Sequence, residues 1–176
     1  MDSLGKAGRD WMADLMRDRR YVAYFMPLLF NDLPGSTASV LRRMRAALKH
    51  VHTTLLDHVA EEDEAAAERN RKAPLRLFAA PARFVPVRAR KSPDDAGKNG
   101  GLHLRAVLLV PRRYWMARRL DRHIEQNQAI YCDLRGRLRR VDAERVERGA
   151  EWKAAELLFQ GIERDAVLHD ESLILL

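Results

Sequence analysis

The stretch Leu102-His-Leu-Arg-Ala-Val-Leu-Leu-Val110 carries the clearest strand pattern in the sequence. Two glycines precede it and Pro111 closes it, so the apolar run is bounded by residues that interrupt regular structure. Side chains on a strand alternate between its two faces. The residues expected to face a core are Leu102, Leu104, Ala106 and Leu108. His103 and Arg105 then share the opposite face, and we expect them to line an open cleft, because burying them without partners would be costly.

The segments on either side of this strand predict a mixed α+β domain. Amphipathic spacing predicts helices over 3–19, from about 37 past 56 (with Ser36 or Thr37 as the cap), over 114–128 and over 149–160 (with Gly161 as the cap). Apolar and β-branched runs predict strands over 21–30, 75–87 (short edge strands), 102–110, 129–134 and 172–176. Residues 88–101 form a loop, and 135–136 form a tight turn whose hairpin partner is 138–146. This order predicts one domain over 1–176, an antiparallel sheet covered by helices, with 1–19 as an N-terminal helix and 20–176 as the core.

Composition favours a folded protein with a polyanionic partner. The 176 residues are 47% hydrophobic and 32% charged, within or above the globular range. The formal net charge is +7, and Arg, which suits bidentate phosphate contacts, dominates the basic residues. Nucleic acid is the favoured partner, although a GC-rich genome that replaces Lys with Arg can also raise the pI. A single cysteine, Cys132, excludes an internal disulfide, and no export signal or membrane span is evident, so we expect a cytoplasmic protein.

Clusters of arginine are spread over several predicted elements rather than confined to a tail. They are Arg42–Arg45, Arg88–Lys91, Arg112–Arg113, Arg118–Arg119 and Arg135–Arg140. Each by itself is typical of a solvated face, but together they could line one groove, with Arg112, Arg113, Arg118 and Arg119 after the 102–110 strand. Tyr114 and Trp115 lie between two of these clusters and could stack on unpaired bases.

The segment Gly101-Leu-His103-Leu-Arg105-Ala-Val-Leu-Leu-Val-Pro111 resembles the metal-binding strand of the HUH endonucleases, the rolling-circle replication initiators. In that family two histidines on one face of the strand help to hold a divalent cation, Mg or Mn, which polarises a phosphate of single-stranded DNA. A Tyr on a later helix then attacks the phosphorus. The resemblance covers roughly residues 20–176 and implies single-stranded or hairpin DNA as the partner.

Two residues depart from the family's pattern. Position 105 is Arg, whose guanidinium has no lone pair to give to a metal, although it could supply fixed positive charge for a phosphate. The C-terminal helix carries Trp152 followed by Lys153 where the family has a nucleophilic Tyr followed by a Lys, and no Tyr follows Tyr131. Lys153 is carried over as a phosphate contact. Tyr114 and Tyr131 are candidate nucleophiles only if the fold places them near His103.

Three hypotheses follow. The first is a DNA-binding, initiator-like protein of a plasmid, phage or mobile element that has lost or reduced nicking activity. The second is a noncatalytic basic module that binds nucleic acid or a partner protein, with His103 and Arg105 as ordinary strand residues. The third is an active nuclease with a metal held by His103 and a carboxylate such as Asp32 or Glu151. The first requires the His103 strand to be central in the sheet, with the polar side of the 149–160 helix packed against His103.

Overall fold

The computed structural model describes residues 3–60, 74–83, 102–132, 137–164 and 174–176. The helical elements are α1 (Ser3–Arg17), α2 (Thr37–Ala60), the 3-10 turn η2 (Trp115–Arg118), α4 (Leu120–Gln126), α5 (Gln128–Tyr131) and α6 (Glu151–Arg164). The strands are β1 (Tyr21–Phe30), β2 (Arg76–Arg83), β3 (Leu102–Pro111), β4 (Leu138–Val141), β5 (Glu144–Arg145) and β6 (Ile174–Leu175). No helix in these ranges has both the length and the apolar character needed to cross a membrane.

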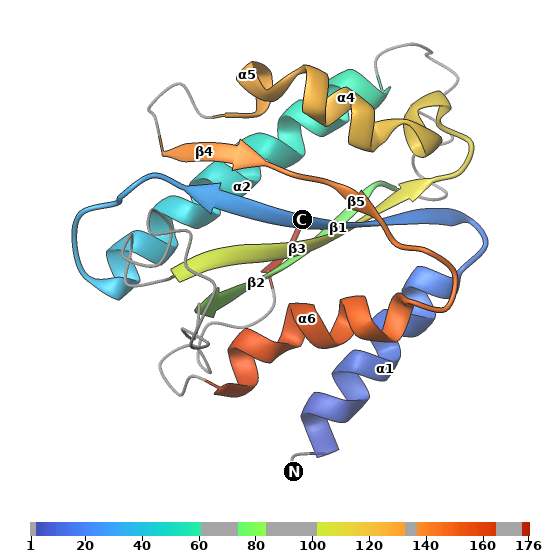
Figure 1. The fold of residues 1–176 in the computed structure, drawn as a ribbon, viewed down its shortest axis with the longest axis horizontal. Coiled ribbons are helices and arrows are strands. Elements are labelled where there is room, and N and C mark those ends of the chain that lie inside the picture. Colours follow the sequence, from blue (N-terminus) through green and yellow to red (C-terminus); the bar gives the residue numbers. More distant parts are fainter. Residues whose placement is uncertain (1–2, 61–73, 84–101, 133–136, 165–173) are drawn as a thin grey trace, which may run out of the picture.

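The six-stranded sheet is open and antiparallel, in the order β4-β1-β3-β2-β6, with β5 also pairing with β1. The succession β1, α2, β2, β3, α4–α5, β4 combined with the spatial order β4-β1-β3-β2 is that of a split βαβ, ferredoxin-like arrangement. Figure 1 shows the result as layers: α2, α4 and α5 lie on one side of the sheet, and α1 and α6 lie on the other. The expected α+β class is thus confirmed.

Several predicted elements are confirmed. The α1 and α2 helices and the β1 and β3 strands occupy the predicted segments, and the Ser36 hydroxyl accepts the Ser39 N–H at 3.4 Å as the cap of α2. Pro27 is tolerated inside β1 because its carbonyl points to the side of β4 and β5, where it accepts the Asp142 N–H at 3.2 Å. The missing N–H of Pro27 points to that same side, between the residues that pair with β4 and those that pair with β5.

The segment after β3 differs from the prediction. Residues 128–131 form the short helix α5 instead of a strand, and the helix predicted over 114–128 is divided into η2, α4 and α5. Residues 138–145 form β4 and β5, which pair with β1 rather than with a 129–134 strand. The predicted turn at 135–136 and the predicted loop at 88–101 lie outside the described residues.

Three smaller predictions are also corrected. Gly161 does not cap the last helix, since α6 continues to Arg164. The β2 strand is not an edge strand, because β6 pairs with Phe78 and Ala79 on its outer side. Pro81 is accommodated in β2 beyond the stretch that β6 covers.

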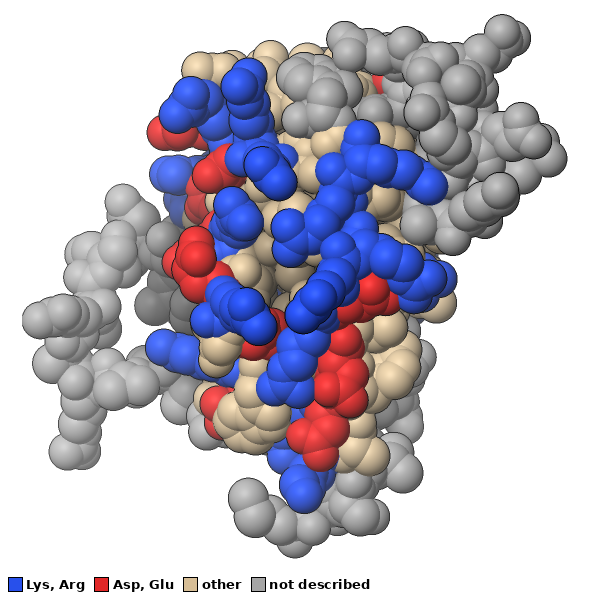
Figure 2. All heavy atoms as spheres, turned by 90° about the vertical axis from the view of Figure 1, so that its right-hand side faces the viewer, with Lys and Arg blue, Asp and Glu red and all other residues tan. Residues whose placement is uncertain are grey.

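One end of the sheet is tied together by backbone hydrogen bonds where β1 begins and β3 ends. The Tyr21 N–H donates to the Asp18 carbonyl at 3.0 Å, and the Arg112 N–H donates to the Arg20 carbonyl at 2.8 Å. This end faces the viewer in Figure 2, which shows Lys and Arg side chains over much of the face, with Asp and Glu among them.

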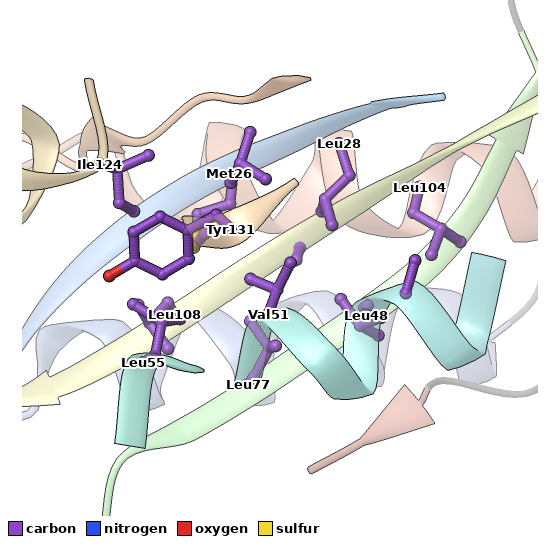
Figure 3. Close-up of a cluster of buried hydrophobic side chains, with 14 of the residues drawn as sticks. Met26, Leu28, Leu48, Val51, Leu55, Leu77, Leu104, Leu108, Ile124 and Tyr131 are labelled. Atoms are coloured by element: carbon purple, nitrogen blue, oxygen red, sulfur yellow. The ribbon is translucent and has the colours of Figure 1, made fainter. Parts of the chain in front are cut away.

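The two faces of the sheet carry separate hydrophobic clusters. On the α2 side, Leu48, Val51 and Leu55 of α2 pack against side chains of the sheet and against Tyr131, as Figure 3 shows. The strand residues Leu102, Leu104, Ala106 and Leu108 belong to this cluster, as their alternation predicts. On the other face, Val107 and Leu109 of β3 pack with residues of α1 and α6. His103 and Arg105 have the same parity as Val107, so they face α6.

Candidate nucleic-acid interface

His103 and Arg105 do lie together, but not in an open cleft. The His103 side chain is 4% exposed, and Arg105 is half-buried. The Arg105 Nε–H donates to His103 Nε2 at 3.2 Å, and its Nη1 donates to the Leu157 carbonyl at 2.9 Å and to Gln160 Oε1 at 3.1 Å, both on α6. The expectation of a cleft is wrong because α6 supplies the polar partners that the two side chains would otherwise have needed from solvent.

These bonds determine what the pair can do chemically. A histidine Nε2 that accepts a hydrogen bond carries no proton, so its lone pair is directed at the guanidinium. Arg105 itself has no lone pair to donate. The two residues therefore do not fit a divalent cation of the kind that two imidazoles hold. Among the described residues, no group of three or more His, Cys, Asp or Glu side chains is arranged to bind a metal ion.

The two candidate tyrosine nucleophiles lie on the other face of the sheet from His103. Tyr131 is fully buried and Tyr114 is nearly so, both in the cluster beside α2. Burial raises the pKa of both phenols above the ordinary value, which disfavours the phenolate. The fold therefore does not bring either hydroxyl to His103. Of the two carboxylates suggested as metal ligands, Glu151 lies at the opposite end of the sheet from His103. Asp32 follows β1, whose last residues lie beside the start of β3.

Arg112, the first of the arginines after β3 that were predicted to bind phosphate, is far from the His103–Arg105 pair. His103 is near the start of β3 and Arg112 follows its end, so about 25–30 Å of strand separates them at about 3.3 Å per residue. Arg112, Arg113, Arg118 and Arg119 are all exposed, as is Lys153 on α6. Tyr114 is too buried to stack on a base, and the side chain of Trp115 lies outside the described part of the chain.

A pocket of about 880 Å³ lies at this end of the sheet and gathers arginines that are distant in sequence. We call the arginines around it the basic end; they are Arg17, Arg19, Arg112, Arg145 and Arg148. They come from the end of α1, the turn before β1, the turn after β3, the β5 strand and the segment between β5 and α6. Of these, the sequence pattern had identified Arg112. The others stand singly or in pairs among carboxylates, so they form no conspicuous run in the sequence.

The charge at the basic end is incompletely balanced. Arg17 pairs with Asp14 at 2.9 Å on the surface. Within the described residues, Arg19, Arg112, Arg145 and Arg148 make no ion pair. Two carboxylates line the pocket: Glu147 is exposed, and Glu151 accepts the Gly149 N–H at 2.9 Å. Guanidinium groups that outnumber carboxylates in a concave site provide a favourable potential for an anion.

Comparisons with protein-family models, curated proteins and solved structures find no match to this chain.

Proposed function

We propose that this protein is a DNA-binding protein resembling a replication initiator of a plasmid, phage or mobile element, and that it binds phosphates at its basic end without cutting the strand. The observation that carries the proposal is the gathering of five arginines from separate segments around one pocket. Arginine forks match phosphate oxygens in pairs, and neutralising phosphates releases condensed counterions. Single-stranded or hairpin DNA is the form that the resemblance favours.

Two placements support the initiator-like part of the proposal. The β3 strand lies between β1 and β2 inside the antiparallel sheet, as a metal-binding strand of that family would. The α6 helix packs on the His103 face and contacts Arg105 through Leu157 and Gln160. The polar-side packing that the resemblance requires is only partial, because α6 turns Ala154, Ala155 and Leu158 to the sheet and leaves Trp152 and Lys153 exposed. Arg105 also engages the lone pair of His103 that a cation would need.

A titration of labelled hairpin and single-stranded DNA, followed by fluorescence anisotropy across a salt series, tests binding. We expect Arg112→Glu with Arg148→Glu to weaken binding more than tenfold. The slope of log affinity against log salt should fall by about 1 for each phosphate that the protein no longer neutralises. The matched control is Arg42→Glu with Lys49→Glu, which makes the same charge change at exposed positions of α2. Equal losses in both double variants would mean that net charge, not the basic end, determines binding.

The same samples, incubated with and without Mn²⁺ and run on a denaturing gel, test cleavage. Binding without a cut or covalent product supports the proposal. Metal-dependent cleavage would contradict the loss of nicking and favour an active nuclease. Absence of DNA binding would contradict the proposed function.

A partner-binding module is the second candidate, because two tryptophans are exposed on the helical layer of α1 and α6. Trp11 is 47% exposed and Trp152 is 42% exposed. Trp152 is held in place, since its Nε1–H donates to Asp10 at 3.3 Å and the Arg9 guanidinium lies 6.0 Å from its ring centre. Exposed, oriented tryptophans are enriched at protein interfaces. Loss of DNA binding in the titration above would favour this candidate.

A further inference from the structure

The pocket at the basic end has the dimensions of a small-molecule site rather than of a surface track for a duplex. Its volume of about 880 Å³ falls within the range of about 300–1,000 Å³ that is typical of ligand sites. A B-form duplex is too wide to enter such a concavity and could contact only its rim. The arginines that line the interior therefore suit a smaller group.

The walls of the pocket combine cationic and apolar surface. Beside the five arginines, the lining includes the partly exposed Val146 and the buried Met16, Tyr21 and Ala23, which all belong to the hydrophobic cluster on this face. A free inorganic anion would use the guanidinium groups and leave the apolar wall in contact with water. A nucleotide presents both kinds of surface, because its phosphates are anionic and its base has apolar faces. Guanidinium planes can also stack on those base faces.

The segments that carry the lining are held by backbone hydrogen bonds. The Tyr21 N–H bonds the Asp18 carbonyl at 3.0 Å, and the Val146 N–H bonds the Ala23 carbonyl at 2.9 Å. Gly149 has φ of 94°, a left-handed conformation that favours glycine, and it lets the chain turn from the pocket wall into α6. Walls that are fixed before a ligand arrives lower the conformational cost of binding.

We propose that this pocket binds a nucleotide, with its phosphate on the arginines and its base or sugar against the apolar wall. The shared chemistry is a nucleotide phosphate, whose source is either a free nucleoside triphosphate or the phosphorylated end of a nucleic-acid strand. The inference rests on the proposed function, because it uses the same arginines. It goes further by assigning a discrete site, whereas the proposed function requires only electrostatic attraction to a polyanion.

Calorimetric titrations at fixed ionic strength with ATP, adenosine and inorganic triphosphate test whether the pocket binds a free nucleotide. We expect ATP to bind at least about tenfold more tightly than either of the other two, since each lacks half of the recognised surface. Arg112→Gln and Arg148→Gln should each weaken ATP binding about tenfold, the loss expected for one charge-assisted hydrogen bond. Arg42→Gln, an exposed arginine on α2, is the matched control and should leave ATP binding unchanged.

Binding of an oligonucleotide with and without a 5′-terminal phosphate tests whether the pocket binds the phosphorylated end of a strand. If the 5′ phosphate increases affinity and Arg148→Gln abolishes that increase, the result supports the proposal, with or without ATP binding. No ATP binding and equal affinity for both oligonucleotides would overturn this inference while leaving the proposed function intact. Triphosphate binding as tight as ATP binding would overturn the role of the apolar wall. Failure of every ligand, oligonucleotides included, would overturn this inference and the proposed function together.

Discussion

Arg105 donates hydrogen bonds from the middle of the sheet to a helix that follows it by some fifty residues. Its contacts with His103, Leu157 and Gln160 join β3 to α6. A histidine at this position would be too short to reach all of these groups while keeping a lone pair for a metal. The same side chain that engages the lone pair of His103 therefore also anchors α6 to β3.

Replacing Arg105 tests this structural role. We expect Arg105→Ala to lower the free energy of unfolding by about 2–4 kcal/mol, because it leaves His103 and α6 acceptors without their charged donor. Urea denaturation measures the change. The exposed Arg42→Ala serves as the control and should stay within about 0.5 kcal/mol of the parent protein. Similar losses in the two variants would show that the Arg105 bonds contribute little to stability.

Gln128 is a second residue whose side chain joins two elements of the fold. Its Nε2 donates to the Val141 carbonyl, and its Oε1 accepts the Val141 N–H at 3.1 Å, so that the amide pairs with β4 as a neighbouring strand would. We expect Gln128→Ala to cost about 1–3 kcal/mol in urea unfolding, since both groups of Val141 lose a partner. Gln126→Ala, an exposed position on α4, is the control. A Gln128 variant as stable as the Gln126 variant would contradict this account.

At the scale of elements, the sequence predicted best where one face of an element is uniformly apolar. The α2 stripe and the alternation in β3 each carry enough periodic residues to determine type and orientation. The segment after β3 was mispredicted because Ala129, Ile130 and Tyr131 form an apolar run too short to distinguish a strand from a helical turn. Tertiary contacts decide that choice, among them the bond at 2.8 Å between His123 Nε2 and the Tyr131 hydroxyl.

The α2 stripe yields a stability prediction. Leu48 is fully buried between α2 and the sheet, so Leu48→Ala should lower the free energy of unfolding by about 2–5 kcal/mol through reduced burial and a residual cavity. The adjacent Lys49 is exposed, and Lys49→Ala should change stability by less than about 0.5 kcal/mol. Thermal and urea unfolding measure both. Comparable effects at the two positions would mean that α2 does not pack through this face.

At the scale of the whole molecule, the topology separates features that are close together in the sequence. His103 and Arg112 lie on one short segment, yet β3 carries them to opposite ends of the sheet. Conversely, Arg17, Arg112 and Arg148 are far apart in sequence and line one pocket. Local patterns identify which residues face one way, but convergence of this kind depends on strand order, which no local pattern contains. This is why the sequence identified Arg112 but not the other arginines that line the pocket.

Two partly buried histidines link the stability of the whole fold to pH. Burial lowers the pKa of His52 and of His123 below the ordinary 6.5, and nearby His58 lowers that of His123 further. His52 Nε2 is buried and makes no hydrogen bond in the structure, so a charged imidazole would lack solvation there. His52 is on α2 and His123 is on α4, both on the α2 side of the sheet, and neither lines the pocket at the basic end, which allows stability to be tested separately from ligand binding.

The sign of the effect follows from the direction of these shifts. Above pH 6.5 both imidazoles are neutral whether the chain is folded or unfolded, so their contribution is constant. As the pH falls through 6.5, the unfolded chain takes up protons that the folded protein does not, so stability decreases until the pH reaches the lowered pKa values. Urea unfolding at about pH 7.5 and about pH 5.5, which bracket the ordinary imidazole pKa, should show this loss. A His52→Gln, His123→Gln double variant should lose less stability over that interval than a His50→Gln variant, because His50 is exposed on α2. If both variants lose as much as the parent, groups other than these two histidines cause the acid sensitivity.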